Sequence, residues 1–266
     1  MADWLAIQGK VVIVTGGSSG IGASIVAELL EQGVTVANFD LKAGKQTAKQ
    51  LTFYQTDISD RAQVEKNVQQ VKATFGTIDG LVNNAGINIP RLLVDENDPH
   101  GKYELAEDVF DKIFRINQKG LFLMSQAVAR VMVENKRGVI VNMSSESGLE
   151  GSEGQSPYAA TKAAVNSYTR SWAKELGKKG IRVVGIAPGI MEATGLRTAA
   201  YEEALSYTRG ITVEDLRRNY SKTTTIPLGR SGKLSEVADL VCYYLSDRSS
   251  YITGVTTNVA GGKTRG

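Results

Sequence analysis

The sequence has few of the side chains on which many kinds of protein site depend. Its 266 residues include one cysteine, Cys242, and one histidine, His100. A single cysteine cannot form a disulfide within the chain, which suits a reducing cytosol. A single histidine makes a histidine-based metal cluster or a Ser-His-Asp triad hard to build, so we expect no metal site. We interpret His100 as a loop residue with local polar contacts and Cys242 as a buried structural thiol.

Long hydrophobic runs and blocks of basic residues are also missing. No apolar run approaches the ~20 residues of a membrane-spanning helix, and the opening MADWLAIQGKVVIVTGG lacks the features of a signal peptide. The formal net charge of +3 is spread without a cluster typical of a nucleic-acid surface. We therefore expect a soluble cytoplasmic protein with no nucleic-acid or membrane partner, and the mild positive charge slightly favours an anionic substrate.

Short apolar runs alternate with helical patterns along most of the chain. Strands are expected at 10–15, 35–40, 52–57, 80–86, 138–145, 181–189 and near 254–262. Helices are expected at 21–33, 61–75, 158–176 and 236–245, with a weaker one at 43–50 and a long one at 106–135 that bends near Gly120. This alternation predicts right-handed βαβ crossovers, and hence an α/β fold with a doubly wound parallel sheet in a single domain over 1–266.

Two segments interrupt the alternation. Residues 87–105 and 190–228 are long excursions that each follow the end of an expected strand, and the second carries extra helical patterns. In such folds, long loops at the strand ends usually carry substrate specificity. We therefore expect these two segments to form the substrate side of a site.

A glycine-rich turn, TGGSSGIG at 15–22, follows the first expected strand and opens the first helix. Its spacing is one residue longer at the front than the G-x-G-x-x-G fingerprint, but it meets the same need. A tight turn brings the backbone close to a pyrophosphate, and the amides at the helix N-terminus supply a positive field. We predict that this Rossmann-type turn binds a dinucleotide through Gly16, Ser18, Ser19, Gly20, Ile21 and Gly22.

An acidic residue, Asp40, ends the second expected strand, 18 residues beyond Gly22. A carboxylate there can accept hydrogen bonds from both adenosine ribose hydroxyls, and it would repel a 2′-phosphate. The residue before Gly20 is Ser19, which is not a basic residue that could bind this phosphate. Lys42 is the only cation near Asp40 in the sequence. The sequence therefore favours NAD over NADP.

Together these pieces resemble the short-chain dehydrogenase/reductase family over essentially the whole chain. The matching stretches are TGGSSGIG, NNAG at 83–86, RINQKG around Asn117, MSSESG around Ser145, YAATK at 158–162 and PG at 188–189. Each stretch is short, but their order and spacing are specific. Ser144 adjoins Ser145, and we choose Ser145 because it lies 13 residues before Tyr158, the separation usual in that family.

The chemistry of the predicted active site rests on Tyr158 and Lys162, which share one face of an expected helix. A free tyrosine has a pKa of about 10, and a nearby ammonium together with the positive charge of oxidised nicotinamide would favour the phenolate. Tyr158 would then remove the alcohol proton as hydride leaves the carbinol carbon, while Ser145 hydrogen-bonds the same oxygen. The resemblance implies that Lys162 also binds the nicotinamide ribose and that Asn117 holds a water that relays protons from Lys162 to solvent.

The resemblance also implies further contacts with the dinucleotide, on the turns that follow later strands. Asp57 and Ile58 match positions that meet the adenine, and Asn84, Ala85 and Gly86 match positions along the adenosine ribose. Asn83 is as well explained by stabilisation of the sheet. Members of the family often read P-G-x-x-x-T after the sixth strand, where the threonine contacts the nicotinamide carboxamide. Here Ala193 takes the threonine position and Thr194 comes one later, so the expected contacts are Tyr158, Lys162, Pro188, Gly189 and the backbone of Ile190 or Met191.

Within the family, the variable stretches AGINIPRLLVD, PHGKYEL, APGIMEATGLRT and NVAGGKTRG are similar to those of polyol-phosphate dehydrogenases. This resemblance implies a homotetramer that interconverts D-sorbitol 6-phosphate and D-fructose 6-phosphate with NAD. Another polyol, a 3-oxoacyl substrate, or a non-catalytic NAD-binding redox sensor are the alternatives. For the substrate phosphate, the candidate ligands are Arg91, Arg197 and Arg209. Three acidic residues are interpreted as solvated loop charges, with polyol binding as the alternative: Glu146, Glu150 and Glu153.

Overall fold

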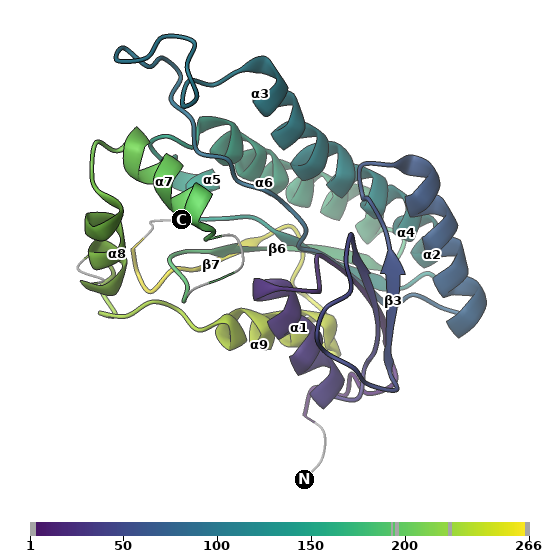
Figure 1. Ribbon diagram of the computed structural model, residues 1–266. Coiled ribbons are helices and arrows are strands. Elements are labelled where there is room, and N and C mark those ends of the chain that lie inside the picture. Colours follow the sequence, from purple (N-terminus) through teal and green to yellow (C-terminus); the bar gives the residue numbers. More distant parts are fainter. Residues whose placement is uncertain (1–3, 193, 195–196, 223–224, 264–266) are drawn as a thin grey trace.

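The computed structural model describes residues 4–192, 194, 197–222 and 225–263. Their seven strands form one parallel sheet in the order β3-β2-β1-β4-β5-β6-β7 (Figure 1). The strands are β1 (Val11–Thr15), β2 (Thr35–Asp40), β3 (Leu51–Gln55), β4 (Gly80–Asn83), β5 (Gly138–Met143), β6 (Ile181–Pro188) and β7 (Thr256–Val259). The chain order reverses direction between β1 and β4, so the predicted doubly wound sheet is confirmed.

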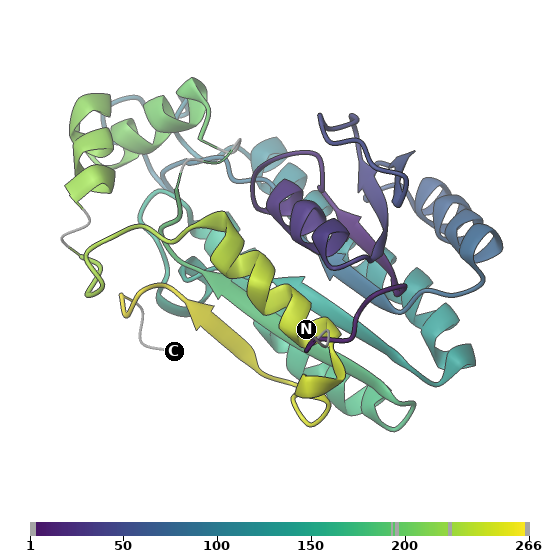
Figure 2. The ribbon, with the colours of Figure 1, turned by 90° about the horizontal axis from the view of Figure 1, so that it is seen from below.

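Helices cover both faces of the sheet. On one face, α1 (Gly20–Glu31) lies against α9 (Leu234–Leu245), which Figure 2 shows side by side. On the other lie α2 (Arg61–Phe75), α4 (Leu121–Asn135) and α6 (Ser156–Gly177). None of the described helices is long and apolar enough to cross a membrane.

The strand β1 shows why the sequence folds in two layers. All five of its residues are buried, and their side chains alternate between the faces: Val12 and Val14 join the core under α1 and α9, whereas Val11 and Ile13 join the core under α2 and α4. Cys242 lies in the first of these cores and is 1% exposed. Burial raises the pKa of its thiol to about 12. The reactive thiolate is therefore disfavoured, in keeping with the interpretation of Cys242 as a structural residue.

One expected helix is absent. The stretch 43–50 is irregular and leads from β2 directly into the edge strand β3. It contains no large apolar side chain, so a helix there would have no face to bury against the sheet. A Cβ at Gly44 would come within 3.0 Å of the backbone of Ser18, which places this stretch close against the glycine-rich turn. The prediction of a weak helix was wrong.

The long helix expected at 106–135 is present but is not regular. It consists of α3 (Glu107–Phe114), a π-helical segment η1 (Arg115–Gly120) and α4. Within the widened segment lies the buried Asn117, and a Cβ at Gly120 would overlap the side chain of Ile58. The irregular turn therefore falls where this helix packs against the end of the sheet, as π-helical segments often do near functional sites.

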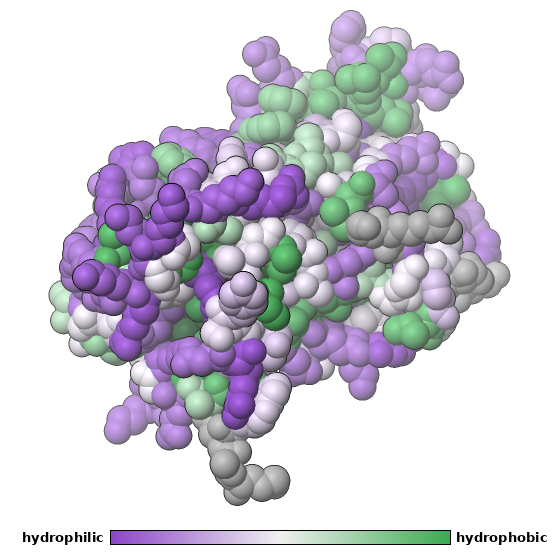
Figure 3. Space-filling view, turned by 180° about the vertical axis from the view of Figure 1, so that it is seen from behind, coloured by the Kyte–Doolittle hydropathy of each residue, from purple (hydrophilic) through white to green (hydrophobic). Residues whose placement is uncertain are grey.

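The two excursions from the alternation meet above the carboxyl edge of the sheet. The second includes α7 (Ala199–Thr208) and α8 (Val213–Lys222). From α7, Tyr207 donates a hydrogen bond to Asp95 at 2.8 Å, and its ring stacks on Tyr103 with centroids 4.2 Å apart. Figure 3 shows hydrophobic side chains near the upper end of the molecule, on the side of the first excursion, where Leu93 and Val94 are exposed. His100, also in that loop, lies 3.2 Å from the carboxylate of Glu104.

We predict that Gly22→Ala lowers the free energy of unfolding by about 1–3 kcal/mol. A Cβ on Gly22 would overlap the backbone carbonyl oxygen of Gly16, and neither atom can move away without a shift of the backbone. Urea denaturation measures the change. Gly177→Ala is the matched control, because nothing lies within 4 Å of its added methyl group at the end of α6. Equal effects of the two substitutions would show that the close approach of Gly22 does not matter.

Candidate active site

A cleft of about 1070 Å³ opens at the carboxyl ends of the central strands. Residues that directly follow β1, β4, β5 and β6 line it, namely Gly16, Asn84, Ser144 and Gly189. The position follows from the topology, because the loops after β1 and β4 leave the sheet in opposite directions and leave a crevice between them.

The glycine-rich turn forms one wall of the cleft. Gly16 and Gly20 have φ angles of 67° and 53°, which favour glycine. Ser19 precedes α1, but its side chain makes no capping hydrogen bond. Ser19 therefore leaves the first amides of α1 uncapped, which suits them to bind an anion such as a pyrophosphate.

Asp40 also lines the cleft, at the end of β2. Its Oδ2 accepts a hydrogen bond from the backbone amide of Ser18 at 3.1 Å, and its Oδ1 accepts one from Leu41 at 2.7 Å. The turn thus holds the carboxylate in place beside the crevice. Lys42, the cation nearest to Asp40 in the sequence, does not line the cleft.

Nearly all of the predicted dinucleotide contacts lie around this one cleft. The lining includes Gly16, Ser19, Gly20, Ile21, Asp40, Asp57, Ile58, Asn84, Ala85, Gly86, Tyr158, Lys162, Pro188, Gly189, Ile190 and Met191. Ser18 and Gly22 are the exceptions. The hydroxyl of Ser18 donates to the carbonyl of Lys42 at 2.6 Å, and Gly22 instead gives room for the carbonyl of Gly16.

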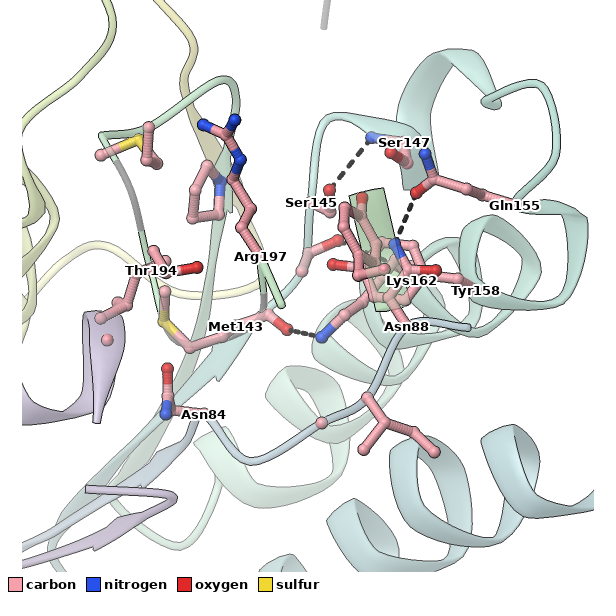
Figure 4. A pocket seen from close by; sticks show the side chains of 18 of the residues that line it. Asn84, Asn88, Met143, Ser145, Ser147, Gln155, Tyr158, Lys162, Thr194 and Arg197 are labelled. Carbon is pink, nitrogen blue, oxygen red and sulfur yellow. Dashed lines mark hydrogen bonds between the residues drawn. The ribbon is translucent and has the colours of Figure 1, made fainter. Parts of the chain in front are cut away.

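The side chains of Tyr158, Lys162 and Ser145 meet in the same cleft (Figure 4). One turn of α6 separates Tyr158 from Lys162, whose Nζ lies 5.6 Å from the centre of the phenol ring. Lys162 also donates to the carbonyl of Met143 at 2.8 Å, which fixes the amine beneath the cleft. Ser145 accepts a hydrogen bond from the amide of Ser147 at 3.2 Å.

The neighbouring serines have different surroundings. Ser145 hydrogen-bonds with Tyr158, and this contact lowers the pKa of the phenol. The hydroxyl of Ser144 instead donates to the carbonyl of Lys162 at 3.0 Å. The choice of Ser145 from its spacing in the sequence therefore agrees with the geometry.

Burial dominates the electrostatics of the Tyr158–Lys162 pair. It raises the pKa of Tyr158 more than the hydrogen bond with Ser145 lowers it, and the charge of Glu146 raises it further. Burial also lowers the pKa of Lys162 to about 8. The sequence had led us to expect that Lys162 and the charge of oxidised nicotinamide together favour the phenolate of Tyr158. Lys162 alone does not lower the pKa of Tyr158 in this structure, and burial disfavours the charged form of both groups.

Asn117 is buried beside the cleft rather than exposed in it. Its side-chain amide makes two hydrogen bonds with the backbone of Ile87. Oδ1 accepts from the amide nitrogen of Ile87 at 2.8 Å, and Nδ2 donates to the carbonyl of Ile87 at 2.9 Å. A third contact joins Nδ2 to Thr161 at 3.2 Å. Asn117 therefore fixes the start of the first excursion against α6, and its proposed water-relay role stays a prediction.

Comparison with known proteins agrees with this geometry. The family model for short chain dehydrogenases matches residues 10–204. This chain belongs to the short-chain dehydrogenase family.

Three relatives show how far the likeness extends. The chain is 63% identical over 268 residues to a sorbitol-6-phosphate 2-dehydrogenase of Klebsiella pneumoniae, covering 100% of both chains. It is 36% identical to a 3-oxoacyl-[acyl-carrier-protein] reductase of Thermotoga maritima, covering 97% of this chain and 99% of that one. Among solved structures, a 3-ketoacyl-(acyl-carrier-protein) reductase of Brucella melitensis complexed with NADH aligns with a TM-score of 0.80 at 28% identity, covering 98% of this chain and 100% of that one.

The structure adds a charged group that the sequence did not reveal. Lys263 lines the cleft and bridges two carboxylates, with its Nζ 2.9 Å from Glu146 and 2.7 Å from Glu150. The side chain of Glu146 is only 12% exposed, so its interpretation as a solvated loop charge was wrong. More than a hundred residues separate these partners in the chain, and no local pattern announces the contact.

Other polar residues of the cleft also escaped the sequence analysis. Asn88 donates to the buried Gln155, just before α6, and Tyr201 and Tyr220 reach the cleft from α7 and α8. Thr194 lines the cleft too, whereas Ala193, the position that departs from the family pattern, falls outside the described residues.

The three arginines proposed to bind the substrate phosphate differ in their position relative to the cleft. Arg197 and Arg209 line the cleft, but Arg91 does not. The guanidinium of Arg91 donates to the carbonyl of Pro90 at 2.7 Å and lies 5.8 Å from the centre of the Tyr103 ring. Arg91 therefore serves the fold of the first excursion.

We predict that the free energy of unfolding rises with pH in the parent protein relative to Lys162→Met. The pKa of buried Lys162 is about 8, whereas its ordinary value is 10.5. At a pH between these two values, the unfolded chain therefore binds more protons than the folded one. The cost of burying the ammonium is therefore fully present below pH 8 and disappears across this window, a gain on the order of 1–3 kcal/mol.

Urea denaturation of both proteins from pH 7 to pH 10.5 measures this difference, and subtracting one curve from the other cancels the titration of Cys242 and of the tyrosines far from Lys162. Parallel curves would show that the amine is solvated.

Proposed function

We propose that this protein is an NAD-dependent oxidoreductase that interconverts D-sorbitol 6-phosphate and D-fructose 6-phosphate by hydride transfer. The observation that carries the proposal is a single cleft in which Tyr158, Lys162 and Ser145 face a glycine-rich turn and Asp40. A relative that is 63% identical over its full length and is named sorbitol-6-phosphate 2-dehydrogenase supports the choice of substrate. A 3-oxoacyl substrate is the second candidate, and the relatives of that name are 32–36% identical.

The residues of the cleft fit a nicotinamide dinucleotide. The first amides of α1 would hold its pyrophosphate, Asp40 its adenosine ribose, and Ile58 the face of its adenine. Lys162, at the floor of the cleft, would donate to the second ribose. When bound, NAD⁺ supplies the acceptor for the hydride and a positive charge beside the phenol.

The chain's own contribution is to move one proton and to hold one oxygen. Tyr158 is placed to take the proton from the alcohol oxygen in oxidation, and to return it in reduction. Ser145, already hydrogen-bonded with the phenol, would donate to the same oxygen as charge develops on it. Because burial raises the pKa of Tyr158, a neighbouring positive charge is needed before the phenolate forms near neutral pH.

An assay for NADH formation with a panel of alcohols tests the proposal most directly. Rapid oxidation of D-sorbitol 6-phosphate, with little activity on unphosphorylated sorbitol and 3-hydroxyacyl thioesters, is the expected result. Preference for another polyol or for the thioester would assign a different substrate within the family. Dinucleotide binding without turnover of any alcohol would indicate a redox sensor.

We predict that Tyr158→Phe loses most turnover, at least about 100-fold in kcat, while its affinity for NAD stays nearly unchanged. The substitution removes only the oxygen that exchanges the proton. Steady-state kinetics and fluorescence titration with NADH measure the two effects. Tyr168→Phe on the same helix is the control, since Tyr168 stacks on Trp172 outside the cleft. A Tyr158→Phe enzyme within about tenfold of the parent rate would remove Tyr158 from this role.

We predict that Asp40→Ser weakens binding of NAD and relieves the rejection of NADP, because the carboxylate that would repel a 2′-phosphate is gone. The ratio of kcat/KM for the two cofactors measures the change. Lys42→Ala, outside the cleft, serves as the control and should leave the ratio near that of the parent. A parent enzyme that already prefers NADP would contradict this interpretation of Asp40.

Two further proposals concern the whole molecule. The excursions 87–105 and 190–228 form the substrate side of the single domain, in keeping with the contact of Tyr207 with Asp95.

We also propose a cytoplasmic homotetramer that buries apolar side chains of α4 and α6. Phe122 is 38% exposed, and the rings of Tyr168 and Trp172 stack 4.9 Å apart toward the surface.

A further inference from the structure

The excursion that carries α7 and α8 holds the arginines Arg197, Arg209 and Arg217. Glu202 on α7 is a buried carboxylate, 7% exposed, and it pairs with Arg197 and Arg217. A substrate phosphate would need a guanidinium that is not already paired with a carboxylate. The question is which guanidinium is available to bind it.

Two of the three donate to Glu202, although the buried Nε of Arg197 has no hydrogen-bond partner among the described residues. Arg217 donates from both Nε and Nη2 to Oε2, at 2.9 and 2.7 Å, and Arg197 donates from Nη2 to Oε1 at 3.0 Å. Arg217 first, and then Arg197, lowers the pKa of Glu202. Arg197 also lies over the ring of Tyr220, 4.1 Å from its centre. These contacts join α7 to α8 and use both carboxylate oxygens.

Arg209 is different. It follows α7 directly, lines the cleft and is half-buried. Among the described residues it makes no ion pair, and its guanidinium has only a long contact of 3.4 Å from Nη2 to the hydroxyl of Ser152. A guanidinium that is partly withdrawn from water and has no anionic partner is suited to a charge-assisted bond with a phosphate.

The position of Arg209 also suits the substrate. Arg209 approaches Ser152, which also lines the cleft and lies in the segment between Ser145 and Tyr158. The guanidinium therefore stands beside the segment that leads to the proton-transferring phenol. A hexitol that reacts at its second carbon carries its phosphate at the opposite end of an extended chain, several bonds from the phenol.

The other cation of the cleft, Lys263, suits a phosphate less well. Its ammonium is held between the carboxylates of Glu146 and Glu150, at 2.9 and 2.7 Å. That group carries a net negative charge, which would repel a phosphate dianion at close range. The same carboxylates are better suited to accept hydrogen bonds from the hydroxyl groups of a polyol.

We propose that Arg209 binds the phosphate of the substrate and thereby selects phosphorylated over unphosphorylated polyols. This inference rests on the proposed function, since it assigns the group that recognises one end of that substrate. Arg197 and Arg217 position the segment through Glu202 but do not touch the phosphate.

The test compares kcat/KM for D-sorbitol 6-phosphate and for sorbitol in the parent, Arg209→Ala, Arg209→Lys and Arg91→Ala enzymes. Losing a hydrogen bond to a charged group should lower kcat/KM for the phosphate ester about 10- to 100-fold in Arg209→Ala, mainly through KM. The value for sorbitol should stay within about twofold. Arg209→Lys should recover part of the loss, because it restores the charge without the fork.

Inorganic phosphate provides a second readout. It should inhibit the parent competitively against D-sorbitol 6-phosphate, and this inhibition should weaken in Arg209→Ala but persist in Arg91→Ala. Equal losses on both substrates in Arg209→Ala would show a structural role and overturn the inference. A parent that prefers the phosphate ester, with Arg209→Ala unchanged, would overturn it while leaving the proposed function intact. A parent that does not oxidise the ester would instead contradict the proposed function.

Discussion

The parallel packing of seven strands is the constraint on which the rest of this structure depends. Parallel strands all present their carboxyl ends at the same edge, and strands buried on both faces leave no other place for polar chemistry. Where the chain order reverses between β1 and β4, the following loops diverge and a crevice must remain. The glycine-rich turn, Asp40 and the Tyr158 helix all reach this crevice because each follows the carboxyl end of a strand or packs beside one.

The burial of Tyr158 and Lys162 would also make proton transfer at this site depend on a bound cofactor. Lys162 is nearly inaccessible and its pKa falls to about 8, while the pKa of Tyr158 rises. Two buried groups that each disfavour their charged form are poorly prepared for proton transfer by themselves. A cationic ring bound beside them would restore the balance, so that under the proposed function the cofactor and the Tyr158–Lys162 pair would act as one electrostatic unit. This coupling would limit proton abstraction to the state in which a hydride acceptor is present.

The two excursions, which we propose as the substrate side, are held together by a different kind of contact. The first excursion and α7 are joined by exposed or half-exposed contacts, among them the Tyr207–Asp95 hydrogen bond and the stacking of Tyr103 on Tyr207. Such contacts contribute less to stability than the strands of the core, and they tolerate exchange of side chains. Members of one family can therefore differ in this region while the sheet and its catalytic residues stay the same.

The sequence by itself determined the sheet, most helices and the inner half of the site. Buried strands such as VVIVT and the amphipathic stretch 61–75 carry strong local periodicity, and TGGSSGIG and YAATK are contiguous motifs whose spacing reflects one turn or one helix. The helix at 43–50 failed because a weak propensity had no apolar face behind it. Only the tertiary structure decided the grip of Asn117 on Ile87, the Glu146–Lys263–Glu150 bridge and the separation of Arg209 from Arg197 and Arg217. These contacts join residues far apart in the chain or choose among like charges, and burial and distance, which set their strength, exist only after folding.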